Sequence, residues 1–468
     1  MKQPIALFWF RNDLRLLDNP ALFHIEEGKS VLPIYIWDET RPDGLKAGGA
    51  SRFWLMRSLI KLQEDLKGSL SFFKGDPLFI LQDLCRRHEI QEVFWNESFE
   101  PFQSKQDQKV QELLRSASIL MHSFNGSLLW DPRNVKTAQG SLYKVFTPFF
   151  KKGCLNAIPP RKPFPKTEKK WFYDPSSLKL QDLPLYSSSQ WHHKMDLLWT
   201  AGEAAALKVW EHFLDQSILS YKNKRDFPFL EGTSKLSSAL HFGEISPHLM
   251  WHEIQTKEPN DSTLCFMKEL GWREFAHYTL FHFPELPRKN FQPSFDNFSW
   301  RSEEHLLQAW KKGETGYPIV DAGMRELWQT GHMHNRVRMI VGSFLVKNLR
   351  IHWREGQKWF WDCLLDADLA NNAFNWQWIT GCGCDAAPYF RIFNPITQAQ
   401  KFDPEGRYIR HYIPELKDLP IPFLFAPWTV NEKILRHAKI ILGKTYPYPI
   451  VDLDISRKEA LEAFKRLR

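Results

Sequence analysis

The stretch from residue 362 to residue 403 combines side chains that seldom occur together without a ligand. Asp366 and Asp368 are followed, before residue 379, by three asparagines and two tryptophans. A buried polar group that finds no hydrogen-bond partner costs about 1 to 3 kcal/mol. A bound polar cofactor would satisfy several such groups at once, so the stretch predicts a binding site. The amides and indoles are Asn371, Asn372, Asn375, Trp376 and Trp378.

A run of hydroxyl side chains forms a second candidate site. Thr233 and Ser234 follow Gly232 directly, Ser237 comes three residues after Ser234, and Tyr221 lies twelve residues before Thr233. Hydroxyls and backbone amides at the start of a helix bind phosphate groups. The same pattern is typical of ordinary helix capping, which is the more common role. From these residues alone both interpretations stay open.

A carboxylate and an indole could share one helical face further along. Glu269 and Trp272 are three residues apart, and residues at this spacing are neighbours on a helix. Together they could hydrogen-bond and stack against the same flat substrate. Glu269 with Arg273 would also form an ordinary ion pair four residues apart.

Residues 331–339 mix amide, guanidinium and thioether groups. Asn335, Arg338 and Met339 share a helical face that could contact an amide-bearing ring system. This face therefore predicts a second part of a substrate or cofactor site.

Metal ligation is not favoured by the histidines or cysteines. The pairs His332 with His334 and His248 with His252 have no evident third ligand, which a zinc site requires. The six cysteines are scattered, and the Cys-Gly-Cys pair at 382–384 is too closely spaced for a zinc knuckle. An iron–sulfur cluster needs four convergent cysteines. We predict structural thiols and no metal site.

Composition indicates a globular protein of more than one domain. The chain has 468 residues, of which 43% are hydrophobic and 25% charged. No apolar run is long enough to span a membrane and no secretory signal is evident, so we expect a cytoplasmic protein. The net charge of +8 comes from one place, because residues 131–170 hold ten basic and two acidic side chains. Charge alone therefore supports nucleic-acid binding only weakly.

Short apolar runs alternate with helical periodicity over residues 1–130. This order predicts a doubly wound α/β domain with a parallel sheet. No glycine-rich nucleotide motif follows the first strand. The expected strands are 5–10, 31–37, 70–73, 93–95 and 119–121, and the expected helices are 51–66 and 76–88, the second capped by Asp76.

The rest of the chain predicts a linker and a helical domain. Residues 131–190 are rich in proline, lysine and serine, which indicates a linker or a long wrapping connection. After residue 191 the periodicity is almost wholly helical, so we expect an all-α domain over 191–468. Its clearest helical segments are 204–219, 246–254, 306–310 and 339–349.

Several blocks of sequence, in the same order, resemble the photolyase/cryptochrome flavoprotein family. The opening reads FWFRNDLRLLDNPAL, and later blocks read TSKLSSALHFGEISP, ELGWREFAHYTLFHFP and TGYPIVDAGMRELWQTGHMHNRVRM. The 362–403 stretch contributes DADLANNAFNWQW and DAAPYFRIFNPITQAQKFD. Within the family, the chain is most similar to bacterial photolyases that repair cyclobutane pyrimidine dimers. The resemblance implies an α/β antenna domain, a long linker and a helical FAD-binding domain.

The resemblance assigns the candidate residues to bound FAD. Asn372 would face the flavin N5, where a neutral amide suits repair better than the aspartate found in several signalling cryptochromes. The remaining FAD residues would be Tyr221, Thr233, Ser234, Lys235, Leu236, Ser237, Arg338, Asp366, Ala367 and Asp368.

Three further groups follow from the same resemblance. The lesion pocket would consist of Glu269, Trp272, Asn335, Met339 and Trp378. The tryptophan relay that photoreduces flavin would consist of Trp376, Trp353 and Trp300. The contacts with the damaged DNA strand would come from Arg225, Arg336, Arg391, Gln398 and Lys401.

The implied activity is light-driven DNA repair. Excited reduced FAD would donate an electron to the dimer, the cyclobutane bonds would split, and the electron would return. Glu269 would stabilise the dimer radical anion through a hydrogen bond. Asn335 and Met339 favour cyclobutane dimers over 6-4 photoproducts.

An antenna chromophore and the protein's partners are the remaining expectations. The antenna would be methenyltetrahydrofolate, with Asn96, Glu97 and Glu100 nearby, or a deazaflavin, or absent. We expect a monomer that acts on UV-damaged DNA. The alternative is a blue-light signalling cryptochrome, disfavoured here by the repair-type pocket and by the lack of a long tail after Arg468.

Overall fold

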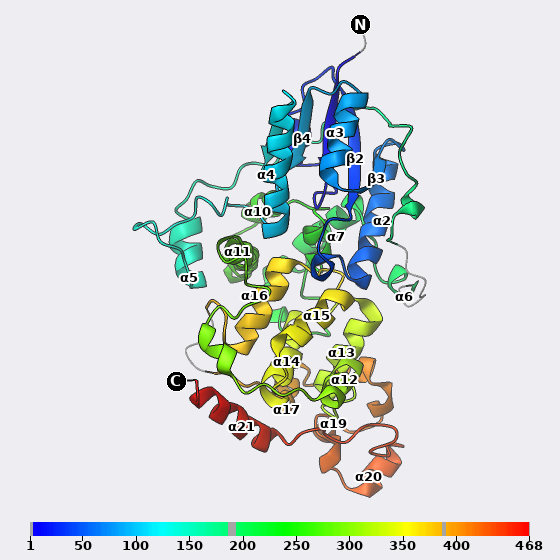
Figure 1. The fold of residues 1–468 in the computed structure, drawn as a ribbon. Coiled ribbons are helices and arrows are strands. Elements are labelled where there is room, and N and C mark those ends of the chain that lie inside the picture. Colours follow the sequence, from blue (N-terminus) through cyan, green and yellow to red (C-terminus); the bar gives the residue numbers. More distant parts are fainter. Residues whose placement is uncertain (1–2, 186–192, 386–389, 468) are drawn as a thin grey trace. The chain divides into compact units, whose positions relative to one another are not determined.

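A computed structural model describes residues 3–185, 193–385 and 390–467, and its contacts divide the chain into two compact units (Figure 1). Residues 186–190 of the predicted linker, residues 191–192 of the predicted helical domain and residues 386–389 of a family block lie outside the described residues. The first unit comprises Met1–Leu219, Ser234–Pro284 and Leu365–Ala370, and the second comprises Ser220–Thr233, Glu285–Leu364 and Asn371–Arg468.

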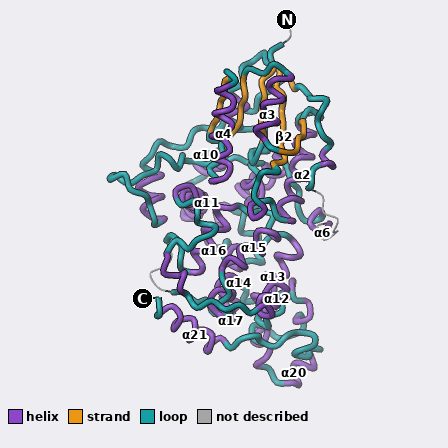
Figure 2. The backbone as a smooth tube through the Cα atoms, in the orientation of Figure 1, coloured by secondary structure: helices purple, strands orange, loops and turns teal. Residues whose placement is uncertain are grey.

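A parallel sheet forms the centre of the first unit. Its strands follow the order β3-β2-β1-β4-β5, and β6 pairs with β2 beside this path. Chain order reverses direction at β1, as in doubly wound sheets, so the predicted α/β fold is confirmed. Figure 2 shows these strands in one part of the chain only. The strands are β1 Ile5–Phe10, β2 Ser30–Asp38, β3 Ser71–Gly75, β4 Glu92–Asn96, β5 Leu120–Phe124 and β6 Lys170–Trp171.

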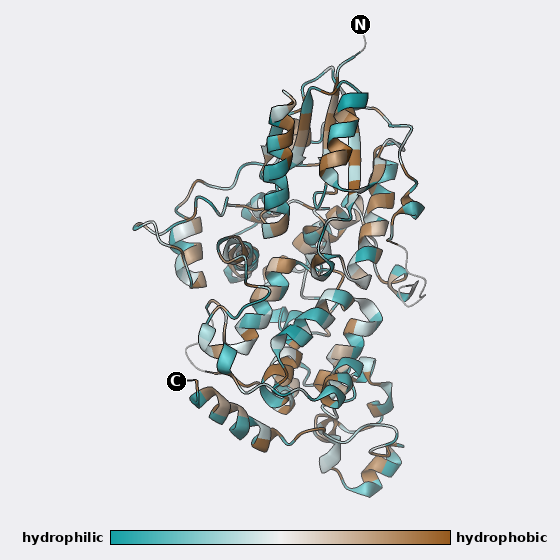
Figure 3. Cartoon of the chain, viewed as in Figure 1, coloured by the Kyte–Doolittle hydropathy of each residue, from teal (hydrophilic) through white to brown (hydrophobic). Residues whose placement is uncertain are grey.

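Side chains of β1 alternate between two hydrophobic cores. Leu7 and Trp9 pack on the face covered by α3 (Pro77–Arg87) and α4 (Pro101–Ser116). Phe8 and Phe10 pack on the face covered by α1 (Pro20–Phe23) and α2 (Gly49–Asp65). Both faces of the sheet are therefore buried, which explains why the strand sequences are unbroken apolar runs. The brown strands of Figure 3 show the same pattern.

The predicted start of α3 is confirmed in detail. The Asp76 carboxylate accepts a hydrogen bond from the Leu78 backbone N–H, and Pro77 is the first helical residue. An aspartate cap followed by proline satisfies an amide that the helix cannot pair and sets the backbone angle of its first turn.

The proline-rich connection wraps around the first unit. The Phe172 amide donates to the Val31 carbonyl at 2.7 Å, and the Leu178 amide donates to the Phe72 carbonyl at 2.9 Å. The connection thus extends the hydrogen bonding of β2 and β3, which supports a wrapping connection over a free linker. Its ordered segments are α5 Phe146–Pro148, a π-helical turn η2 Phe149–Cys154, β6 and a 3-10 turn η3 Leu180–Asp182.

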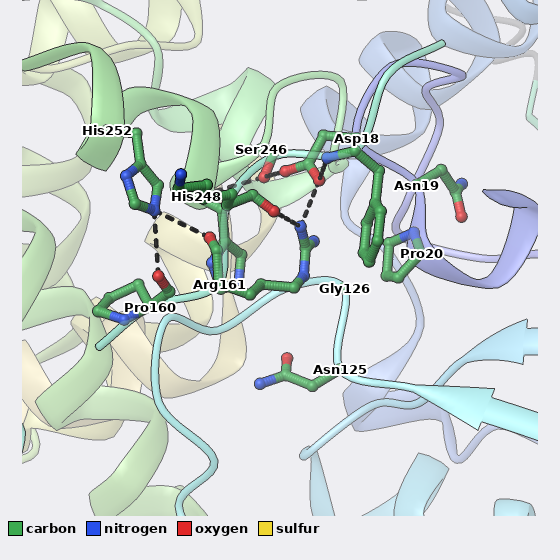
Figure 4. A network of polar contacts seen from close by, with 12 residues as sticks. Asp18, Asn19, Pro20, Asn125, Gly126, Pro160, Arg161, Ser246, His248 and His252 are labelled. Carbon is green, nitrogen blue, oxygen red and sulfur yellow. Dashed lines mark hydrogen bonds and ion pairs between the residues drawn. The ribbon is translucent and has the colours of Figure 1, made fainter. Parts of the chain in front are cut away.

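A buried polar network ties the connection to two other parts of the first unit (Figure 4). The fully buried Asp18 carboxylate pairs with the Arg161 guanidinium and accepts hydrogen bonds from the Ser246 hydroxyl and the Phe164 amide. A buried carboxylate needs such partners, because its desolvation is costly. These bonds link residues that are more than 140 positions apart in sequence.

Histidines complete this network. The Nε2 atom of His252 lies 3.0 Å from the carbonyls of Pro160 and Arg161, and Nε2 of His248 lies 3.1 Å from the Leu128 carbonyl. Burial lowers the pKa of His248 to about 3, so this histidine stays neutral at physiological pH. The His248 and His252 pair, considered above as metal ligands, therefore bonds to backbone carbonyls.

Helices complete the first unit around these contacts. Ser246 caps α10 by accepting a hydrogen bond from the His248 amide, as the predicted start of this helix requires. The helices are α6 His193–Asp196, α7 Glu203–Gln216, α9 Ser237–His241, α10 Pro247–Gln255 and α11 Asp261–His282. A short 3-10 turn, η1, spans Asp43–Leu45.

The regular elements in the described residues of the second unit are all helices, which confirms the predicted all-α character. The segment expected as one helix at 339–349 is instead α14 followed by a π-helical turn, η7. None of its described helices is long and apolar enough to cross a membrane, nor is any in the first unit. The main helices are α8 Tyr221–Lys224, α12 Glu304–Lys312, α13 Pro318–Thr330, α14 Asn335–Ser343, η7 Phe344–Asn348, α15 Trp353–Cys363, α16 Leu369–Thr380, α17 Pro395–Phe402, α18 Arg407–Tyr412, α19 Ile421–Leu424, α20 Glu432–His437 and α21 Leu453–Lys465, joined by 3-10 turns η5 Ile218–Ser220, η6 Pro293–Asn297, η8 Pro414–Leu416 and η9 Pro427–Thr429.

We expect Arg161→Leu to lower the free energy of unfolding by about 3 kcal/mol, because it leaves the Asp18 carboxylate buried without its cation. Urea denaturation measures this loss. Lys162→Leu is the matched control, since its side chain is exposed one residue away. Equal unfolding free energies for the two variants would contradict a structural role for the ion pair.

Candidate cofactor and nucleic-acid site

The hydroxyl run before α9 is not used to cap that helix. Leu236 is the N-cap residue, and no side chain makes a capping hydrogen bond there. Lys235 has a left-handed backbone, with φ of 54°, which non-glycine residues adopt only under local constraint. The capping interpretation is therefore wrong for α9. The hydroxyls of Ser234 and Ser237 remain predicted phosphate ligands.

Asp368 lies between two histidines of the first unit. Its carboxylate oxygens are 3.4 Å from Nδ1 of His241 and 3.5 Å from Nε2 of His277. Both nitrogen atoms are buried and make no hydrogen bond within the described structure. Burial lowers the pKa of His277 to about 4, so this ring is neutral at pH 7. Buried polar atoms without partners are typical of a site that a ligand completes.

Other predicted FAD residues of the first unit sit beside this cluster in sequence. Asp366 is half-buried and Ala367 is buried. Sequence reasoning missed His241 and His277. Both lie inside the quoted blocks, but their sequence separation from Asp368 hid the contact.

The second unit holds the remaining predicted FAD residues. The Asn372 amide nitrogen donates to the Gln357 carbonyl at 3.1 Å, which fixes the amide's orientation. The Arg338 Nε donates to the Met333 carbonyl at 2.7 Å. Tyr221 is buried and Thr233 is half-buried.

Glu269 and Trp272 lie on α11, so the predicted helical spacing of the lesion pair is confirmed. Both side chains are half-buried. The Trp272 ring stacks on Phe146, with ring centroids 3.7 Å apart and an interplanar angle of 10°. Phe146 in turn stacks on Phe150 at 5.6 Å. The wrapping connection therefore fixes the plane of the Trp272 indole.

A buried carboxylate, Glu274, lies on the same helix two residues after Trp272. Glu274 accepts a hydrogen bond from the Trp130 amide at 3.2 Å and lies 3.4 Å from the Arg273 guanidinium. Burial raises the pKa of Glu274 to about 7. Arg273 also donates to the Ser127 carbonyl.

The other lesion residues belong to the second unit. Asn335 is exposed at the first residue of α14, and Met339 is half-buried one turn later. Trp378 is half-buried on α16. His334 caps α14 through its Nδ1 atom, which excludes that atom from metal ligation.

All five predicted DNA-binding residues lie in the second unit, and three basic side chains there gather around aromatic rings. The Arg336 guanidinium lies 4.4 Å from the Phe402 ring centre, and the Lys401 ammonium lies 5.1 Å from the same ring. Arg336 also pairs with Asp226 at 2.8 Å. Arg225 lies over the Tyr221 ring at 5.1 Å.

This basic cluster touches the lesion set directly. One Arg336 nitrogen lies 3.8 Å from the Met339 sulfur. Arg391 is exposed, and Gln398 is half-buried on α17, the helix that also carries Lys401. Arg391 and Lys401 are exposed cations of the kind that contact a phosphate backbone.

The predicted tryptophan relay lies within the second unit. Trp353 is fully buried, and its Nε1 donates to the Asn290 side chain at 2.8 Å. The His352 ring bridges Trp300 and Trp353, with centroid distances of 4.9 and 5.5 Å. Trp300 is therefore close to Trp353, which supports its predicted place in the relay.

Trp376 packs against the helix that begins at Trp353. A Cβ atom added at Gly356 would lie 2.1 Å from the Trp376 ring. Gly356 is three residues after Trp353, so the missing side chain lets the two indoles approach the same helical face. Gly356, which sequence reasoning missed, therefore makes room for the Trp376 ring.

The predicted antenna residues already have protein partners. The Asn96 amide donates to Asp13 at 2.6 Å and to Asn19 at 2.8 Å. Glu97 pairs with Arg133 and Glu100 pairs with Arg41. These contacts give the three residues a structural role in the first unit, and the predicted antenna contact stays a prediction.

The cysteines show no arrangement for a metal. Cys382 and Cys384 are buried free thiols, and burial raises the pKa of Cys382 above its ordinary value. No group of three or more metal-ligating side chains occurs among the described residues.

We expect Gly356→Ala to destabilise the protein by about 2 kcal/mol, because the new methyl group overlaps the buried Trp376 ring. Urea denaturation measures the change. Gly342→Ala is the matched control, since its added Cβ would meet Ile379 at an ordinary contact distance of 3.4 Å. Similar stabilities for both variants would show that Trp376 is not confined by Gly356.

We expect Glu274→Gln to change how stability depends on pH. The raised pKa means that the folded protein binds an extra proton between about pH 4.5 and 7, so this group's contribution to stability falls as pH rises through that range. Glutamine does not titrate. The variant should therefore gain about 3 kcal/mol relative to the unmodified protein between pH 4.5 and 8, measured by urea denaturation. Parallel stability curves would contradict burial of an ionisable Glu274.

Comparison with known proteins places this geometry in a family. Residues 6–168 match the model described as DNA photolyase, and residues 266–466 match the FAD binding domain of DNA photolyase. The deoxyribodipyrimidine photo-lyase of Agrobacterium fabrum is 43% identical, over 100% of this chain and 99% of that protein. Cryptochrome-1 of Arabidopsis thaliana is 34% identical over 99% of this chain and 70% of its own length.

A solved structure agrees with these similarities. The crystal structure of a bacterial class III photolyase from Agrobacterium tumefaciens has a TM-score of 0.94 and 42% identity, and the match covers 100% of this chain and 98% of that chain. The resemblance drawn from the sequence motifs is confirmed. The chain belongs to the DNA photolyase and cryptochrome family and carries that family's FAD-binding domain.

Proposed function

We propose that the protein is a deoxyribodipyrimidine photolyase that uses light to split cyclobutane pyrimidine dimers in UV-damaged DNA. The basic cluster of Arg336, Lys401 and Phe402 carries this proposal, because it joins cations suited to DNA phosphates to Met339 of the lesion set. The named photo-lyase relative supports the same activity. The protein is proposed to act as a monomer.

One feature of the described residues supports FAD binding independently of the similarity to known proteins. The buried nitrogens of His241 and His277 lack hydrogen-bond partners beside the Asp368 carboxylate, so the cluster suits a polar ligand. Bound, reduced FAD would supply the light-excited electron donor of the reaction. The residues proposed to hold it are Tyr221, Thr233, Ser234, Lys235, Leu236, Ser237, Arg338, Asp366, Ala367, Asp368 and Asn372.

The lesion residues have separate roles in this proposal. Trp272 offers one indole face to the bases, while Phe146 stacks on the ring from the protein side. Glu269 would donate or accept a hydrogen bond at a base carbonyl and stabilise the charge that develops on the dimer. Asn335, Met339 and Trp378 are proposed as further contacts with the lesion. The damaged pair is extruded more cheaply than an intact one, because it stacks poorly.

Electron entry and domain roles complete the proposal. The succession Trp300, His352 and Trp353 supports a relay towards Trp376, which would keep the flavin reduced. We assign residues 1–130 to an antenna domain, 131–190 to a linker and 191–468 to the catalytic domain. A folate or deazaflavin antenna belongs to the first of these.

The test is repair of a thymine-dimer oligonucleotide by the purified protein, under blue light and in darkness. We expect light-dependent repair only, and Glu269→Gln should lower the yield several-fold with an unchanged flavin absorption spectrum, because a hydrogen bond to a charged intermediate is lost. Exposed Glu258→Gln, in the same unit, should repair normally.

Three other outcomes of this experiment would contradict parts of the proposal. Repair in darkness would contradict the photochemical mechanism. Loss of flavin from the Glu269→Gln protein would place Glu269 in the cofactor site and not in the lesion pocket. A flavin-loaded protein that responds to light but repairs no dimers would favour the alternative function as a signalling cryptochrome. One relative of the chain is named Cryptochrome-1.

A further inference from the structure

A fully buried lysine in the second unit has no role in the site described so far. Lys347 lies in the π-helical turn η7 and is 1% exposed. Among the described residues it has no carboxylate partner, and burial lowers its pKa to about 7. A lysine is almost never buried in this way without a specific contact, because its ammonium group loses hydration.

The contacts of Lys347 are with one short segment. Its Nζ donates to the Arg391 carbonyl at 2.8 Å, and the ammonium lies 3.6 Å from the Phe390 ring centre. Ser343 lies four residues earlier and is also fully buried, and its hydroxyl accepts a hydrogen bond from the Phe393 amide at 3.1 Å. Two side chains one helical turn apart therefore hold the backbone at alternate residues.

The held segment leads directly into the proposed DNA-binding surface. Arg391 is exposed, and three residues later Asn394 caps α17 by accepting hydrogen bonds from two of its first amides. Helix α17 carries Gln398 and Lys401. The register of these three side chains along a DNA strand depends on where the backbone of residues 391–394 is fixed.

Only a long side chain that ends in a hydrogen-bond donor can reach the Arg391 carbonyl from this buried position. A buried apolar side chain would fill the same volume but leave the Arg391 carbonyl without a partner, which costs about 1 to 3 kcal/mol. A backbone carbonyl without a hydrogen-bond partner in this non-helical segment would favour local opening of the segment.

We propose that Lys347 is a positioning residue that holds the Arg391–Asn394 backbone so that Arg391 and α17 meet the phosphates of the damaged DNA strand. The inference rests on the proposed function. Lys347 itself touches no DNA in this account, since it is buried beneath Phe390 and Arg391.

The test compares Lys347→Met with the unmodified, FAD-loaded protein. Methionine keeps the apolar length and removes the donor. We expect roughly fivefold weaker binding of a dimer-containing oligonucleotide, as one hydrogen bond of about 1 kcal/mol predicts. The plot of log affinity against log salt should become less steep by about one phosphate contact. Amide hydrogen exchange over residues 390–400 should be faster without DNA.

Two variants make the result decisive. Ser343→Ala removes the second, weaker anchor and should shift exchange and salt dependence in the same direction, even if Lys347→Met does not fold. Asn348→Leu is the matched control, because it breaks a hydrogen bond to Ser456 of α21 from the same turn. It should speed exchange in α21 and leave the salt dependence unchanged.

The outcomes separate the inference from the function on which it rests. No preference of the unmodified protein for dimer-containing DNA would refute the proposed function. If that preference is present, unchanged exchange at 390–400 or an unchanged salt dependence in both Lys347→Met and Ser343→Ala would overturn the role of Lys347.

Discussion

The cost of burying a polar or charged group determines much of this structure. The Asp18 carboxylate has no exposed surface, so it must be satisfied by protein groups. Its partners come from Arg161 and Phe164 in the wrapping connection and from Ser246 at the start of α10. One buried charge therefore sets the relative positions of three distant segments of the first unit.

The same constraint separates structural polar groups from those prepared for a ligand. The Asn96 side-chain amide donates hydrogen bonds to Asp13 and Asn19, so its N–H groups are paired within the protein. His241 and His277 are different, because each has a buried nitrogen that lies near the Asp368 carboxylate but makes no hydrogen bond within the described residues. His277 and Asp368 lie within residues 266–466, which match the FAD binding domain of DNA photolyase.

In the second unit, aromatic rings lie beside several cations. Phe402 lies beside Arg336 and Lys401, and Phe390 lies beside Lys347. A ring face attracts a cation without neutralising its charge. Of these cations, exposed Lys401 keeps its positive potential for a phosphate backbone, whereas Arg336 is paired with Asp226 and Lys347 is buried.

The sequence by itself determined the local elements and the family. A short unbroken apolar run located β1, and helical periodicity after an Asp-Pro start located α3, because burial on both faces and on one face leave these two different patterns. Tertiary structure alone decided that Gly356 makes room for Trp376, that Phe146 stacks on Trp272, and that the hydroxyl run does not cap α9. These features depend on contacts between residues distant in the chain, and no local pattern encodes which distant partner fills a given space.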